Sequence, residues 1–177
     1  MTVVFRGKWF EVEQQPIVLG NGERIIAEWV SRTDGVRVIA RRKDGAVLIT
    51  NEYRSELATR DYRLPGGKVE NGDTPLQAAI GELREETGFR AAEWIPLCNT
   101  QAFAMVRYSL HYFEARTLAL DPIQHDEGED IRVEWFTLEE AVRMALDGRI
   151  GEDLSAFQIL RLASREGQLR EMTPTSA

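Results

Sequence analysis

Four short runs of apolar and β-branched residues, separated by turn signals, occupy the first part of the chain. They cover 11–18, 24–30, 36–39 and 46–50. Gly20-Asn21-Gly22 separates the first two runs, and Asp44-Gly45 separates the last two. Glycine after asparagine or aspartate favours a tight turn between strands. This pattern predicts β-strands at the four runs.

The segment 75–87 has the residue spacing and the end signals of an amphipathic helix. Its apolar stripe consists of Leu76, Ala79, Ile80 and Leu83. Thr74 suits the N-cap, and Gln77 completes a capping-box pattern with it. Gly88 stands where a left-handed C-cap belongs. The sequence therefore predicts a helix from Pro75 to Thr87.

The remaining apolar pattern predicts two more strands and two more helices. The strands are expected at 108–115 and 131–136, and the helices at 138–146 and 153–164. In the last helix, Leu154, Phe157 and Leu160 recur three residues apart and are expected to face inward. Strands mixed with a few helices, one of them central in the sequence, are typical of an α/β sandwich.

Composition narrows the class of protein. The chain has 177 residues, of which 43% are hydrophobic, enough for one compact domain with a small extra element. Its net charge of -7 disfavours nonspecific binding to nucleic acid, because like charges repel. No apolar run is long enough to span a membrane, and residues 1–9 do not resemble a signal peptide. With a single cysteine, Cys98, the chain is expected to be a soluble cytoplasmic protein.

The candidate chemistry lies on the helix at 75–87. Glu82, Glu85 and Glu86 project from one side of it and repel one another, at a cost of about a few tenths of a kcal/mol per pair. A divalent cation would reverse that cost, since Mg²⁺ prefers carboxylate oxygens. The three glutamates alone are better explained as a solvated acidic face. The preceding Gly66-Gly67 pair favours a metal site, because glycine lets the backbone approach a ligand closely.

Residues 67–89 resemble the Nudix box, in which a glycine, an acid and a Glu-rich cluster recur at fixed spacing. Gly67, Asp73 and the cluster 81–89 occupy these positions. The resemblance implies an α/β fold, the Nudix α/β/α sandwich with a mixed central sheet plus an N-terminal antiparallel β extension. It divides the chain into an extension at 1–33, a catalytic domain at 34–167 and a C-terminal tail at 168–177.

The resemblance also implies a metal site, with Mg²⁺ or Mn²⁺ held by Glu82, Glu86 and the Gly66 carbonyl. Glu85 is then expected to act nearby or through water. In the acidic loop 125–133, Glu127 resembles the general base that activates water, and Glu129 resembles a further metal ligand. A solvated acidic loop is the alternative interpretation of that segment.

Two positions of the box depart from the family pattern. Asp73 replaces the usual first glutamate, and Gly81 replaces an arginine that braces the carboxylates in the family. Glycine also costs a helix up to about 1 kcal/mol relative to alanine. The hypotheses are that Arg84 or Arg90 partly substitutes for the missing arginine, or that the metal binds more weakly.

Segments outside the box are similar to ADP-ribose and nucleotide-sugar pyrophosphatases. They are 7–12, 19–22, 27–30 and 47–54. In that subgroup the N-terminal strands pack or swap across a homodimer and help to form the nucleotide pocket. The resemblance implies that Trp29 stacks on the base and Arg54 clamps phosphate. A core or interface role for Trp29 and a surface ion pair for Arg54 are the alternatives, and Glu52 stands where the subgroup has glutamine.

The resemblance favours an enzyme that hydrolyses a nucleoside diphosphate sugar to a nucleoside monophosphate and a sugar phosphate. The absence of a proline about sixteen residues past the box leaves GDP-mannose and other nucleotide sugars open beside ADP-ribose. A nucleoside triphosphate or RNA-end pyrophosphohydrolase is one alternative, which the extension and the acidic charge disfavour. A non-catalytic nucleotide-sensing module is another, which the retained box glutamates disfavour. The expected partners are a nucleotide sugar and a second copy of the chain, with no nucleic acid and no membrane.

Overall fold

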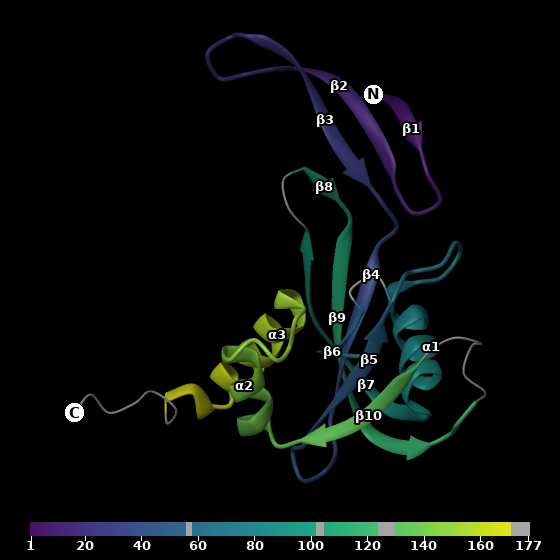
Figure 1. Ribbon diagram of the computed structural model, residues 1–177, viewed down its shortest axis with the longest axis vertical. Helices are drawn as coiled ribbons and strands as arrows, with labels where there is room; N and C mark the ends of the chain where they lie inside the picture. Colours follow the sequence, from purple (N-terminus) through teal and green to yellow (C-terminus); the bar gives the residue numbers. More distant parts are fainter. Residues whose placement is uncertain (56–57, 102–104, 124–129, 171–177) are drawn as a thin grey trace.

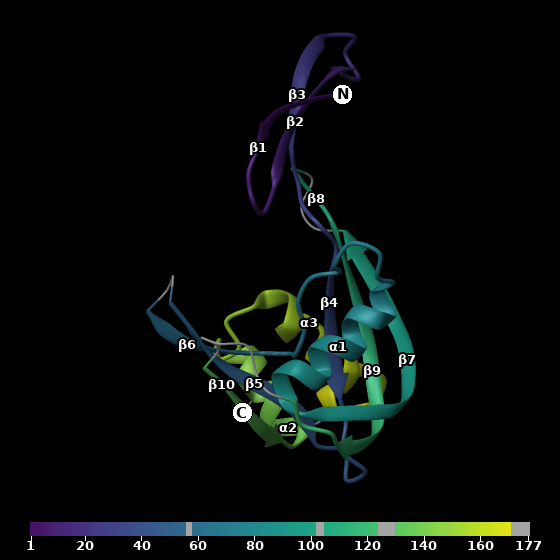
Figure 2. The same ribbon diagram turned by 90° about the vertical axis from the view of Figure 1, so that its right-hand side faces the viewer.

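The computed structural model describes residues 1–55, 58–101, 105–123 and 130–170. The chain forms two parts, an N-terminal arm and a body (Figure 1). The arm contains β1 (Thr2–Arg6), β2 (Glu11–Val18) and β3 (Arg24–Ser31), paired antiparallel in that order. The short strand β8 (Val106–Arg107) of the body joins the arm sheet parallel to β3. Both views show the arm extending beyond one end of the body (Figure 2).

Within the described residues, the body contains two three-stranded sheets and three α-helices. The first sheet is mixed, in the order β4 (Gly35–Ala40), β9 (Ser109–Leu120) and β7 (Phe89–Gln101). The second is antiparallel, in the order β10 (Ile131–Phe136), β5 (Val47–Arg54) and β6 (Thr59–Arg63). The helices are α1 (Pro75–Thr87), α2 (Leu138–Leu146) and α3 (Asp153–Arg165), followed by the 3₁₀ turn η1 (Gln168–Arg170). No helix of the described ranges is long and apolar enough to cross a membrane.

The core has two layers because β4 and β5 are buried on both faces. Val36, Val38 and Leu48 pack in one cluster with Ala79 and Leu83 of α1. Ile39, Val47 and Ile49 pack in the other with residues of α2 and α3, among them Val142 and Ile159. Side chains alternate between the faces of a strand, so one strand supplies both layers. Figure 1 shows α1 and the α2–α3 pair on opposite sides of these strands, which confirms the predicted sandwich and its antiparallel extension.

The end signals of the predicted helices are confirmed in detail. Thr74 and Gln77 form a capping box at α1, and Gly88 ends that helix in the left-handed region with φ 70°. Thr137 forms an equivalent capping box with Glu140 at the start of α2. These caps satisfy backbone groups that a helix leaves open at its ends, so they fix where each helix begins or stops.

Two predictions about inward faces are confirmed only in part. On α1, Ala79 and Leu83 of the predicted stripe are fully buried, whereas Leu76 and Ile80 are 38% and 42% exposed. On α3, Leu160 packs against the core as predicted, whereas Phe157 is 50% exposed, and the buried face contains Ala156, Ile159, Leu162 and Ala163. Steps of three and four residues alternate along that face, as from 156 to 159 and from 159 to 163, which follows the helical period.

Candidate active site

The loop that follows β6 contains Gly66 and Gly67, and we call it the glycine loop. It is hydrogen-bonded to the first half of β4. The Val38 N–H donates to the Pro65 carbonyl at 2.8 Å, and the Val36 N–H donates to the Gly67 carbonyl at 2.9 Å. Gly66 has φ +146°, and a Cβ placed on it would lie 2.1 Å from the Val36 carbonyl oxygen. A side chain at this position would therefore lift the loop off the strand. Glycine is required here for both its conformation and its size.

Helix α1 brings two of its glutamates against this loop. The Gly66 N–H donates to Oε2 of Glu86 at 2.9 Å. A Cβ placed on Gly67 would lie 1.9 Å from Oε1 of Glu82, so that carboxylate lies directly against the bare glycine. Glu85 is exposed on the neighbouring side of the helix. The fold thus brings Gly66, Glu82 and Glu86 together, while Glu85 points toward solvent.

The electrostatics around Glu86 suit a cation. Burial raises the pKa of Glu86 to about 8, and the negative charges of Glu82 and Glu52 add to that rise. The Gly66 N–H and the positive charge of Arg37 act in the opposite direction. Carboxylates that share a half-buried site cannot all be ionised without cost, and a divalent cation removes that cost. Hard oxygen donors beside bare backbone therefore fit Mg²⁺ or Mn²⁺.

The positions of Arg84 and Arg90 do not support the hypothesis that one of them replaces the box arginine. Arg84 turns to Asp121, with Nε at 3.0 Å from the carboxylate. Arg90 is exposed at the start of β7. A Cβ placed on Gly81 would meet only Oε1 of Glu85, at 3.5 Å, so this part of α1 has open space. The charge that offsets burial of Glu86 comes instead from Arg37 on β4.

A cavity of about 530 Å³ lies where the arm meets the body. It is lined by Trp9, Phe10, Val30, Arg32, Arg54 and Lys68. The ammonium of Lys68 lies 3.5 Å from the centroid of the Trp9 ring, and that of Lys8 lies 4.5 Å from it. Because Lys68 directly follows Gly67, the cavity adjoins the glycine loop. It combines an exposed aromatic ring with several cationic groups.

The predicted substrate-binding residues Arg54 and Trp29 have different surroundings. Arg54 lines the cavity, and its Nη1 lies 3.0 Å from both carboxylate oxygens of Glu52. Trp29 lies on β3 with the guanidinium of Arg107 over its ring at 3.8 Å, and it is not among the residues that line the cavity. Trp9, which is not among the predicted site residues, lines it instead. Its sequence signal is weak, because it is only an aromatic residue beside a lysine before a strand.

The predicted residues Glu127 and Glu129 lie outside the described residues. The next described residue, Asp130, accepts the Tyr53 N–H at 3.1 Å and forms an ion pair with Arg60. Ile131 then pairs with Glu52 in the sheet. The chain therefore re-enters the sheet beside the end of β5 that carries Glu52 and Arg54.

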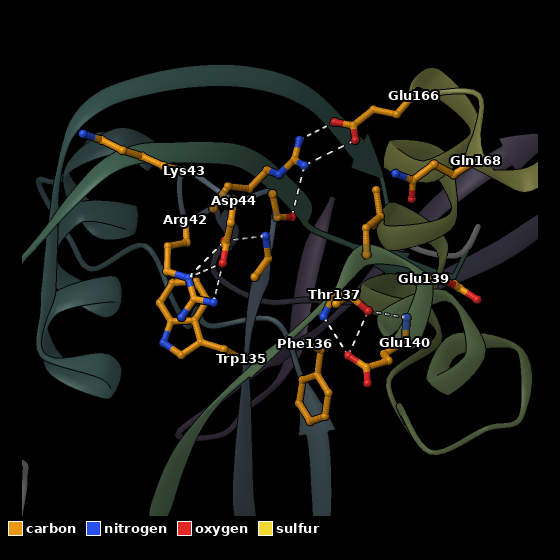
Figure 3. Close-up of a pocket in the computed structure, with 14 residues that line it drawn as sticks. Arg42, Lys43, Asp44, Trp135, Phe136, Thr137, Glu139, Glu140, Glu166 and Gln168 are labelled. Atoms are coloured by element: carbon orange, nitrogen blue, oxygen red, sulfur yellow. Dashed lines mark hydrogen bonds and ion pairs between the residues drawn. The ribbon is translucent and has the colours of Figure 1, made fainter.

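A wider cavity of about 870 Å³ lies at the opposite end of β4 (Figure 3). None of the predicted site residues lines it. Two ion pairs lie among its lining residues, Arg42 with Asp44 and Arg41 with Glu166. Thr137 and Glu140 are joined in the capping box of α2. The size of this cavity is therefore a poor guide to function, and the glycine loop is the better candidate.

Replacing Gly66 by alanine is expected to destabilise the protein by about 1–3 kcal/mol, because the new Cβ meets the backbone of β4 in a strained conformation. Gly81→Ala is the matched control on the neighbouring helix, where space is open. It is expected to stabilise the protein by up to about 1 kcal/mol. Urea unfolding of both variants measures the difference, and an unchanged free energy for Gly66→Ala would contradict the close-packed loop.

Comparison with known proteins agrees with this geometry. The family model of the NUDIX domain matches residues 31–155. The chain is 28% identical to "ADP-ribose pyrophosphatase" of Bacillus subtilis (strain 168), over 92% of this chain and 90% of that protein. It is 26% identical to "Methanol dehydrogenase activator" of Bacillus methanolicus, over the same shares.

A solved structure has the same fold along nearly the whole chain. It is described as "Crystal structure of ADP compounds hydrolase", with a TM-score of 0.78 and 21% identity. The match covers 94% of this chain and 93% of that one, so it includes the arm as well as the body. Together with the loop and helix described above, the match of the family model across most of the sequence shows that the chain belongs to the NUDIX domain family.

Proposed function

We propose that the protein hydrolyses the pyrophosphate bond of a nucleoside diphosphate sugar, of the ADP-ribose or GDP-mannose type. The products are a nucleoside monophosphate and a sugar phosphate, and the reaction depends on Mg²⁺ or Mn²⁺. The observation that carries the proposal is the continuity between the glycine loop, with Glu82 and Glu86, and the aromatic and cationic cavity. Similarity to an ADP-ribose pyrophosphatase over 92% of the chain supports it.

In this proposal the metal is held by the carboxylates of Glu82 and Glu86 and by the Gly66 carbonyl. A bound divalent cation would neutralise charge that develops on the diphosphate oxygens. Arg54 binds a phosphate oxygen, and Glu52 holds its guanidinium in place at 3.0 Å. The Glu52–Arg54 pair also gives a role to Glu52, which stands where the subgroup has glutamine. A carboxylate at that position can orient the arginine directly.

For the base of the nucleotide we favour Trp9 over Trp29. Trp9 is 58% exposed and lines the cavity, whereas Trp29 is not among the residues that line it. Glu127 is proposed as the general base and Glu129 as a further metal ligand, with Glu85 acting through water. The anchoring of Asp130 beside Glu52 supports a position for that segment near the substrate.

We further propose a homodimer formed through the arm, with residues 1–33 as the dimerisation unit and 34–167 as the catalytic unit. The arm exposes many large apolar side chains. Those at least 40% exposed are Met1, Val3, Val4, Phe5, Trp9, Phe10, Val18 and Ile26. A monomer seldom leaves a patch of this kind in water, and a second copy of the chain would cover it.

The free Cys98 and the absence of a spanning helix among the described residues are compatible with the cytoplasm, where we place the protein.

A substrate panel tests the reaction. Release of phosphate-containing products is measured from ADP-ribose, GDP-mannose, diadenosine polyphosphates and dNTPs, each with Mg²⁺ and with Mn²⁺. Nucleotide sugars are expected to be hydrolysed, and turnover of dNTPs alone would overturn the proposal.

Glu86→Gln is expected to lower kcat by about 100-fold or more, since even the outer partners of a metal site contribute 10–100-fold. Near-wild-type kcat in both Glu127→Gln and Glu129→Gln would remove these residues from the site.

The stacking role of Trp9 is tested by its effect on KM. Trp9→Ala is expected to raise KM for the nucleotide sugar by about 5–150-fold, because stacking of a base on an aromatic ring contributes about 1–3 kcal/mol. Trp9→Phe keeps an aromatic face and is expected to retain most of the affinity. Trp29→Ala serves as the comparison. A rise in KM for that variant, with none for Trp9→Ala, would return the role to Trp29.

The dimer is tested by sedimentation velocity. The mass obtained from sedimentation of the wild-type protein is expected to be twice the chain mass of 20.1 kDa. Ile26→Glu places a charge on the exposed apolar surface of the arm and is expected to yield monomers. Glu28→Gln, on the same strand, is the control and should remain dimeric. A monomeric wild-type protein at micromolar concentration would refute the interface.

A further inference from the structure

A buried ion pair joins β4 to the start of α3. The Arg37 and Glu152 side chains are 12% and 20% exposed. Nε of Arg37 donates to Oε2 of Glu152 at 2.8 Å, and Nη2 donates to Oε1, so the pair is bidentate. Buried ion pairs are costly to desolvate, and apolar residues of similar volume often stabilise a fold as well. A contribution to stability alone is therefore a weak explanation for this ion pair.

The Glu152 side chain contacts Arg37 instead of capping α3. It stands at the N-cap of α3, but its side chain forms no capping hydrogen bond. Its carboxylate instead accepts from Arg37 and from the Ser155 hydroxyl. The oxygen of Ser155 in turn accepts the Leu64 N–H at 3.2 Å. Leu64 precedes Pro65 and Gly66, so the hydrogen bonds run from Arg37 to the start of the glycine loop.

Arg37 also lies directly beneath that loop. Its Nη1 donates to the Val36 carbonyl at 2.9 Å, and this is the oxygen against which Gly66 packs. The Gly66 N–H holds Glu86, and the positive charge of Arg37 attracts the same carboxylate. Arg37 therefore reaches the loop from two directions, through the β4 backbone and through Glu152 and Ser155.

We propose that Arg37 is a positioning residue that, with Glu152 and Ser155, holds the Gly66 loop and Glu86 in the arrangement that accepts the divalent cation. This inference rests on the proposed metal-dependent function. It also accounts for Gly81, because the positive charge near the box carboxylates comes from a neighbouring strand instead of from the helix. Arg84 does not take that role, since it is engaged by Asp121.

The chain offers a matched control at the other end of the same strand. Arg41, directly after β4, has the same side-chain exposure as Arg37, 12%, and forms an ion pair with Glu166. That pair lies beside the cavity of Figure 3, away from the glycine loop. If Arg37 serves stability alone, the two ion pairs should respond alike to equivalent substitutions.

The experiment uses the full-length protein without substrate. Mn²⁺ binding is measured by isothermal titration calorimetry for wild type, Glu152→Gln, Arg37→Lys and Ser155→Ala, and for the controls Glu166→Gln and Arg41→Lys. Loss of the outer partners of a metal site weakens affinity by about 10–100-fold. Glu152→Gln and Arg37→Lys are expected to raise the Kd for Mn²⁺ by about tenfold, and Ser155→Ala by a smaller factor. The controls are expected to stay within about twofold of wild type, whatever their Tm.

The outcomes separate the inference from the proposed function. If the wild-type protein binds Mn²⁺ and Glu152→Gln and Ser155→Ala bind it equally well, the positioning role is wrong while the metal site stands. If wild type itself does not bind Mn²⁺, both fail. Glu152→Gln keeps the shape of the side chain, so it decides the question even where Arg37→Lys unfolds. The Mg²⁺ concentration for half-maximal hydrolysis should rise in parallel with the Kd.

Discussion

The contact between the backbone of Gly66 and the Val36 carbonyl determines the rest of the site. No side chain intervenes, and a single Cβ would lie only 2.1 Å from that oxygen. The closeness of the loop sets where the Gly66 N–H meets Glu86 and where the bare face of Gly67 meets Glu82. It also sets where Lys68 emerges to reach Trp9 of the arm. Two consecutive glycines thus determine both a cluster of carboxylates and one wall of the cavity.

Strand β4 serves the core and the site at the same time. Val36 and Val38 face α1, and Ile39 faces α2 and α3, so the strand is held on both sides by apolar packing. The N–H groups of Val36 and Val38 then pair with the glycine loop. A strand held so firmly is a rigid base for a site, because displacing it would disturb two packed layers at once.

Features with a local physical cause could be predicted from the sequence. The capping box at Thr74 and the glycine at Gly88 predicted the bounds of α1, and the spacing of the Nudix box predicted that Glu82 and Glu86 lie beside the glycine loop. Strand β6 could not be predicted, because its residues Thr59–Arg63 are polar and become a strand by pairing with β5. Strand β7 was missed for a related reason, since Pro96 interrupts the pattern at a shift in its register with β9.

The residues missed at the site depend on contacts between distant segments. Arg37 is a lone arginine in an apolar strand, and its partner Glu152 lies 115 residues away. Trp9 and Trp29 are both aromatic residues of the arm, and only the fold separates the one that lines the cavity from the one that Arg107 covers. Side-chain partnership over such distances follows from the sheet order and leaves no local signal.

The cavity has one wall on the arm and one on the body, which are connected by the short segment between β3 and β4 and also contact each other through β8 and the Trp9–Lys68 pair. A ligand that holds these two walls in one orientation uses part of its binding free energy for that restriction. Any event that restricts the arm beforehand removes that cost and raises the affinity by the same free energy. By reciprocity, a bound ligand strengthens whatever contact orders the arm. The conformational entropy of the first thirty or so residues thus contributes to the affinity of any ligand that binds across both walls of this cavity.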